Sequence, residues 1–172
     1  ICQSFAVDGF FFDIVGPLND SSVWARRGMQ TLGLDPADNA ARIAFGQRVI
    51  DDFKLEMTSF VRGFHPDATI FYNAGHISPF ARQGFPAYSH LELESLPSTG
   101  QWGYLHYPLT ARYARTLGMD NLGMTGKFHT TWGDFHSFKN PAALQYECFR
   151  MLALNSKCSI GDQLQPDGKI CQ

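Results

Sequence analysis

Short apolar segments that end in polar residues recur along this chain, and the first of them sets the pattern. Residues 7–15 read Val-Asp-Gly-Phe-Phe-Phe-Asp-Ile-Val and are followed by Gly16-Pro17. A continuous aromatic and β-branched run bounded by turn residues predicts a fully buried strand of a parallel sheet. Asp13 lies at its end, where a charge is costly unless it is paired or exposed in a site.

Four later segments repeat this pattern. We expect strands at 68–73, 88–95, 121–128 and 157–160. Because side chains alternate along a strand, His90, Glu92 and Glu94 should share one face of the second of these segments, and two leucines the other.

Helical periodicity separates the expected strands. The clearest helix is capped by Asp38 or Asn39 and ends near Gly63. Its apolar stripe consists of Phe45, Val49, Phe53, Met57 and Phe60. Further helices are expected at about 21–32, at 107–117 with Pro108 in the first turn, and from Asn140-Pro141 onward. The order β-α-α-β-β-α-β-α-β predicts an α/β fold with a parallel sheet and right-handed crossovers.

Composition narrows the classes of protein. The 172 residues suffice for one domain, 1–172, with a real core. Aromatic residues make up 14%, which argues against disorder and suits the stacking of sugar rings, although core packing is their commoner use. A net charge of −2 gives no sign of a nucleic acid or an anionic membrane as partner. No apolar run approaches the ~20 residues of a membrane span.

The cysteines and the first residue give information on the cellular compartment of the protein and on processing of the chain. Cys2, Cys148, Cys158 and Cys171 show neither a CxxC spacing nor a zinc pattern. We expect reduced, partly buried thiols in a cytoplasmic protein, because a Cys2–Cys171 bridge would need an oxidising compartment. No signal peptide is visible, and we interpret the start at Ile1 as a processed chain or a fragment.

Polar residues lie at or directly after the carboxyl end of every expected strand, and they are candidates for one shared active site. They are Asp13, then Asn73 and His76, then Glu92 and Glu94, then Lys127 and His129, and finally Asp162. In barrels of parallel strands chemistry gathers at the carboxyl ends, so five such ends favour a site over chance. The plainer alternatives are that Asp13 caps a helix or pairs with a buried Arg, and that Glu92 and Glu94 line the solvated face of an edge strand.

Two carboxylates on separate strands are what glycoside hydrolysis needs. Asp13 is the best single candidate, and Glu94 is preferred over Glu92 as acid/base because it lies nearer the end of its strand. Asp13 should then stay ionised beside a donor or cation such as Lys127 or His129. Glu94 should lie in drier surroundings, with Trp132 as a wall.

A dense loop of His129, Trp132, Asp134 and His136 allows two interpretations. Trp132 can be a stacking platform for a sugar whose hydroxyls bond to the His and Asp groups, and Asn73 and His76 would serve similarly. A metal-dependent hydrolase using the two loop histidines and Asp134 is the alternative, although their spacing matches no zinc pattern. A further alternative is that each of these histidines is a structural residue whose hydrogen bonds are satisfied within the fold. We therefore expect no metal or organic cofactor.

Several stretches resemble known glycosidases. Residues 7–13 resemble the fourth barrel strand of retaining α-L-fucosidases, where a hydrophobic strand delivers the nucleophilic Asp. Other stretches resemble a bacterial group of hypothetical glycosyl hydrolases associated with a second α-L-fucosidase family; they are 52–58, 70–76, 90–95, 126–136 and 159–163. The resemblance extends from Val7 to Gly168.

The resemblance implies a (β/α)8 barrel, often followed by a β-galactosidase-type trimerisation domain. This chain would be a partial TIM barrel holding strands four to eight, with Asp13 as nucleophile, a carbohydrate as substrate and homo-oligomers as an option. The loop after Asp13 is often Cys-rich in such proteins, but residues 19–22 are Asn-Asp-Ser-Ser. A half-barrel leaves unpaired edges and a bare apolar face, so the chain alone would be inactive or depend on partner copies. A non-catalytic carbohydrate-binding remnant is the alternative.

Overall fold

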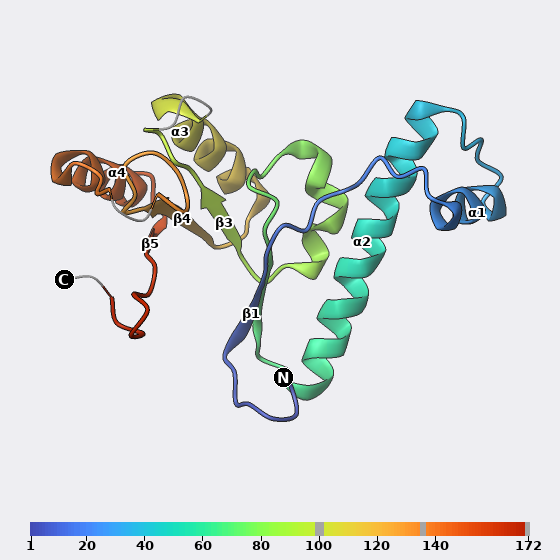
Figure 1. Ribbon diagram of the computed structural model, residues 1–172, viewed down its shortest axis with the longest axis horizontal. Coiled ribbons are helices and arrows are strands. Elements are labelled where there is room, and N and C mark those ends of the chain that lie inside the picture. Colours follow the sequence, from blue (N-terminus) through green and yellow to red (C-terminus); the bar gives the residue numbers. More distant parts are fainter. Residues whose placement is uncertain (99–101, 135–136, 171–172) are drawn as a thin grey trace. The chain divides into compact units, whose positions relative to one another are not determined.

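The computed structural model describes residues 1–98, 102–134 and 137–170, and its strands and α-helices follow the predicted order (Figure 1). The strands are β1 (Gly9–Phe12), β2 (Thr69–Tyr72), β3 (Leu91–Glu94), β4 (Asn121–Gly126) and β5 (Lys157–Gly161). The α-helices are α1 (Val23–Thr31), α2 (Asn39–Phe64), α3 (Gly103–Ala114) and α4 (Pro141–Ala153). Two 3-10 helices, η1 (Pro79–Ala87) and η2 (Arg115–Leu117), complete the set.

The strands form two small parallel sheets, β1-β2 and β3-β4-β5, and the described residues close no barrel. The chain divides into two compact units. The first comprises Ile1–Ala74 and Pro79–Ser89, and the second comprises Gly75–Ser78 and the described part of His90–Gln172. Within the described ranges, no helix is both long and apolar enough to cross a membrane.

In the first unit, α2 buries a polar stripe in place of its apolar one. Asp51, Lys54 and Thr58 are buried, whereas Phe53 and Phe60 of the apolar stripe are 38% and 55% exposed. The buried stripe packs on η1. Thr58 Oγ1 donates to the carbonyl of Ala87 at 2.7 Å, which removes the cost of burying its hydroxyl.

The first strand is less buried than its sequence predicted. Phe11 is 46% exposed, and Phe10 and Phe12 are only half-buried. The ladder of β1 is formed with β2, in the register Gly9 to Thr69 through Phe12 to Tyr72. Phe12 stacks on Tyr72 with ring centroids 4.8 Å apart, but among the described residues no strand pairs with the other edge of β1. The prediction of a fully buried strand is therefore wrong for this chain.

In the second unit, α3 and α4 pack on one face of the sheet (Figure 1). A Cβ added to Gly123 of β4 would meet Met151 of α4 and Tyr107 of α3, so this glycine lets both helices approach. Leu93, which is opposite Gly123 in the ladder, is buried on the same face. The alternation predicted for this strand therefore holds, and Glu92 and Glu94 project from the opposite face.

The third helix begins earlier than predicted. It starts at Gly103, so Pro108 lies inside the helix and not in its first turn. The proline ring removes one intrahelical hydrogen bond, to the carbonyl four residues earlier. Pro108 is buried, and so are its neighbours Tyr107 and Thr110. Packing of this part of α3 therefore compensates for the missing hydrogen bond. The helix signals in the sequence carry no information on this packing.

The described cysteines, Cys2, Cys148 and Cys158, are free thiols. Burial raises the pKa of the Cys158 thiol to about 11, and the neighbouring Cys148 acts in the same direction. Cys171, the partner considered for Cys2, lies outside the described residues.

Candidate functional site

In the first unit, the carboxylate of Asp13 is held by the end of the neighbouring strand. Since β1 and β2 are parallel and in register, the residues that follow them meet, and Asn73 Nδ2 donates to Asp13 Oδ1 at 3.0 Å. The Asn73 N–H donates to the Phe12 carbonyl at 2.7 Å, and the Val15 N–H donates to the Asn73 carbonyl at 2.7 Å. These backbone bonds extend the ladder past both strands and fix the position of Asp13.

The residue after Asp13 has an unusual backbone. Ile14 has φ of +55°, a left-handed conformation that is strained for a β-branched side chain. Its side chain is 88% exposed, so no side-chain burial compensates for the strain. The hydrogen bonds on either side, at Phe12 and Val15, hold the turn in place. Such strain, stored next to a carboxylate at a strand end, is a recurrent feature of functional sites.

In the second unit, Glu94 contacts Trp132. The Trp132 indole Nε1 donates to Glu94 Oε1 at 2.7 Å, and the Glu94 residue is only 8% exposed. The indole ring lies against Gly126 and Gly161, the last residues of β4 and β5: a Cβ on Gly161 would lie 2.2 Å from Trp132 Cζ3. Phe128 packs edge-on against the same ring at 5.6 Å. The expected wall beside Glu94 is thus present, and it is also a hydrogen-bond donor.

Other predicted site residues of the second unit have partners of their own. Lys127 forms an ion pair with Asp162. The contact with Lys127 lowers the pKa of the Asp162 carboxyl. The Lys127 and Asp162 side chains are 11% and 25% exposed. Glu92 Oε1 lies 3.0 Å from His90 Nε2. The donor described beside Asp13 is the Asn73 side-chain amide. The carboxylate partner of Lys127 is Asp162. A pairing of Lys127 or His129 with Asp13 stays a prediction.

Asp134 organises its own loop. It accepts hydrogen bonds from Thr130 Oγ1 at 2.8 Å and from Ser137 Oγ, and these bonds, with the nearby His129, lower the pKa of the Asp134 carboxyl. These hydrogen bonds hold Thr130 and Ser137 around the Asp134 carboxylate. His136, the third residue of the metal hypothesis, lies outside the described residues. Within the described ranges, no group of three or more His, Cys, Asp and Glu is placed to hold a metal ion.

His106 and Ser95, which sequence reasoning missed, form a hydrogen-bonded chain with the predicted site residue His76. His76 Nδ1 lies 2.9 Å from His106 Nε2, and His106 Nδ1 lies 3.1 Å from Ser95 Oγ, directly after Glu94. Burial lowers the pKa of His106, and the neighbouring His76 acts in the same direction. In the sequence His106 lies within α3 and not at the end of a strand, so no strand-end signal marks it. Ser95 could have been found from its place after the strand.

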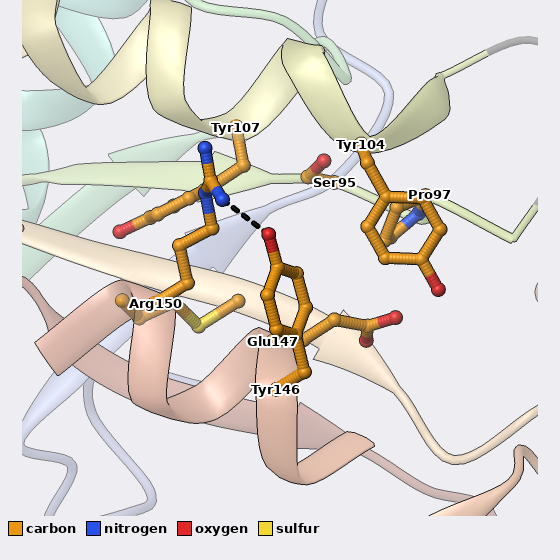
Figure 2. A pocket seen from close by; sticks show the side chains of 8 residues that line it. Ser95, Pro97, Tyr104, Tyr107, Tyr146, Glu147 and Arg150 are labelled. Atoms are coloured by element: carbon orange, nitrogen blue, oxygen red, sulfur yellow. Dashed lines mark hydrogen bonds between the residues drawn. The ribbon is translucent and has the colours of Figure 1, made fainter. Parts of the chain in front are cut away.

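The hollow between α3, α4 and the end of β3 is too small for a sugar. Figure 2 shows a hollow lined by Ser95, Pro97, Tyr104, Tyr107 and residues of α4. Its volume of about 10 Å³ accommodates at most one water molecule. Tyr146 Oη accepts a hydrogen bond from Arg150 Nη1 at its rim. The contact between Trp132 and Glu94 makes the opposite face of the sheet the candidate site of this unit.

A comparison with known proteins gives one strong match. The chain is similar to the solved structure of α-L-fucosidase isoenzyme 2 from Paenibacillus thiaminolyticus, with 44% sequence identity and a TM-score of 0.92. The match covers 99% of this chain and 26% of that chain, so this chain spans about a quarter of the enzyme's length. No protein-family model and no curated protein matches. The similarity in sequence and fold confirms the resemblance, and the chain is related to the α-L-fucosidases.

Proposed function

We propose that this chain is part of a retaining glycoside hydrolase of the α-L-fucosidase type, which removes a terminal sugar from a carbohydrate. The observation that carries the proposal is the match to an α-L-fucosidase at 44% identity over 99% of this chain. The placement of carboxylates at the ends of parallel strands supports it, because this is where barrel enzymes carry their chemistry.

Asp13 is proposed as the nucleophile. In the first step its carboxylate attacks the anomeric carbon, the glycosidic bond breaks, and a covalent glycosyl-enzyme forms. The Asn73 amide occupies Oδ1 and so orients the carboxylate. The backbone bonds at Phe12 and Val15 fix the same segment. A nucleophile held in this way loses little freedom when the substrate binds.

Glu94 is proposed as the acid/base. It first gives a proton to the leaving oxygen, and later takes one from the water that hydrolyses the intermediate. The Trp132 indole fixes Oε1, and its rings reduce the contact of Glu94 with water. Sugar contacts are proposed for the remaining strand-end residues: Asn73, His76, Glu92, Lys127, His129, Trp132, Asp134 and Asp162.

We also propose that the 172 residues are strands four to eight of a (β/α)8 barrel within a longer protein. The exposed face of β1 and the exposed apolar stripe of α2 support this, since a preceding strand and helix would cover them. Second copies of the chain are a further option for the same surfaces. The exposed apolar residues also favour the alternative of a carbohydrate-binding remnant, in which the site is incomplete.

The test is hydrolysis of an aryl α-L-fucoside by the complete protein. Release of the aryl group is expected, and Asp13→Ala should abolish it. Added azide should then restore part of the activity, because it replaces the missing nucleophile. Asp8→Ala, which changes a carboxylate before the same strand, is the matched control and should retain activity. Full turnover by Asp13→Ala would show that Asp13 is not the nucleophile. If the parent protein binds fucose but does not hydrolyse the aryl fucoside, the alternative of a carbohydrate-binding remnant is favoured.

A further inference from the structure

The loop between β4 and α4 carries Trp132, and its two ends meet. Lys127 follows β4, and Lys139 precedes Asn140, which caps α4. The Lys139 N–H donates to the Lys127 carbonyl at 2.7 Å. The described parts of the loop are 127–134 and 137–139, and the first and last residues of the loop therefore lie side by side. Its two lysine side chains have different partners, since Lys127 pairs with Asp162.

Lys139 belongs to a buried polar cluster on the helix side of the sheet. Its Nζ donates to Glu147 Oε2 at 2.6 Å and to Thr125 Oγ1 at 2.8 Å, and the Thr125 hydroxyl donates to the same Oε2 at 2.7 Å. The Lys139 and Glu147 side chains are only 2% and 4% exposed. Figure 2 shows Glu147 projecting from α4 beside Tyr146. The cluster ties the return of the loop to both β4 and α4.

The same loop places Trp132 on the other face of the sheet. There its ring lies against Gly126 and Gly161, and its Nε1 donates to Glu94. Thr125 and Gly126 are consecutive in β4, so their positions face opposite sides. The loop is thus anchored on the helix face and delivers a hydrogen-bond donor to the carboxylate face.

A buried ion pair is a weak argument for stability, because apolar residues of similar size often replace it without loss. Its attested use is to select one geometry among several. We propose that Lys139 and Glu147 are positioning residues, which hold the loop in the geometry where Trp132 donates to Glu94. The inference rests on the proposed function only for the chemical role of Glu94.

The experiment is NMR of this chain with ¹⁵N-labelled tryptophan. The three tryptophans give three indole signals, and Trp132→Phe assigns the relevant one. In Lys139→Met/Glu147→Leu the Trp132 indole proton should exchange with solvent about tenfold faster. The matched control is Lys157→Met/Asp120→Leu, which removes an ion pair whose side chains are 76% and 81% exposed. It should leave the Trp132 signal and its exchange unchanged.

Thr125→Val provides a milder variant if the double replacement does not fold. It keeps the shape of the side chain and removes two hydrogen bonds of the cluster, so exchange at Trp132 should accelerate about twofold. Unchanged exchange at Trp132 in either folded variant overturns the proposal. In the complete protein, Thr125→Val should lower kcat for poor leaving groups and leave KM unchanged. An inactive parent protein would count against the proposed function, while the NMR result would still decide the positioning role.

Discussion

An alanine at Gly161 is expected to displace Trp132 from Glu94. The added Cβ would lie 2.2 Å from Trp132 Cζ3 and 2.3 Å from Cη2, distances that non-bonded carbons do not tolerate. The third nearest atom, the Thr125 carbonyl oxygen at 3.5 Å, is at ordinary contact distance. Gly161 ends β5 and its φ is outside the left-handed region, so alanine meets no backbone strain. The perturbation therefore acts through the indole ring.

The magnitude follows from the contacts that the indole would lose. Trp132 is 37% exposed, so it can move outward instead of forcing the strands apart. It would then lose its hydrogen bond to the Glu94 carboxylate, a contribution of about 1.5–3 kcal/mol. The edge-on contact with Phe128 adds about 0.5–1.5 kcal/mol. We expect the free energy of unfolding to fall by about 2–4 kcal/mol.

A double-mutant cycle with urea unfolding measures this effect. Gly161→Ala should cost about 2–4 kcal/mol in the parent chain but less than about 0.5 kcal/mol in a Trp132→Ala background, where the ring is absent. Gly126→Ala is the graded comparison: its Cβ would lie 3.1 Å from the same ring, and the cost should be smaller. Gly63→Ala, whose Cβ meets nothing within 4 Å, replaces a glycine of α2 without a clash and should stabilise the chain, because alanine has the higher helix propensity. Equal costs of Gly161→Ala in both backgrounds would refute the reasoning.

Three further predictions concern proton and metal chemistry. Since burial lowers the pKa of His106 below its ordinary 6.5, the unfolded chain binds more protons, and the free energy of unfolding should fall as pH drops from about 7 to about 5. Urea titrations across this range should show a shallower fall for His106→Asn; an identical slope would exclude His106 as its source. In the complete protein, Glu94→Ala should slow fucosides with poor leaving groups far more than activated aryl fucosides, and equal losses on both would remove Glu94 from the acid role. Dialysis against EDTA should leave this turnover unchanged, whereas a loss reversed by a transition metal would favour the metal-dependent alternative.

The local signals of the sequence predicted the order and type of the strands and α-helices, but not the 3-10 helices. A strand or a helix is encoded within a window of a few residues, by period and by cap, and the structure has Asp38 as the cap of α2 and Asn140 as the cap of α4. The alternation of Leu91, Glu92, Leu93 and Glu94 likewise follows from strand geometry alone. The resemblance to α-L-fucosidases also lay in the motifs and was confirmed by the match.

Packing decided which faces are buried. The apolar stripe of α2 is visible in the sequence, yet α2 buries Lys54 and Thr58. The Ala87 carbonyl accepts a hydrogen bond from the Thr58 hydroxyl, and the Lys54 ammonium lies over the Tyr88 ring. The exposure of Phe11 depends on which strands pair with β1, and no local pattern contains that information.

The contacts of the candidate site also required the tertiary structure. Asn73 meets Asp13 because β1 and β2 pair in a particular register, although 60 positions separate the two residues. Trp132 meets Glu94 because two strands end in glycines that leave space for the indole. Sequence named all four of these residues as candidates, since residue type and strand-end position are local properties. Their partners depend on distances between segments, and only the folded chain determines those distances.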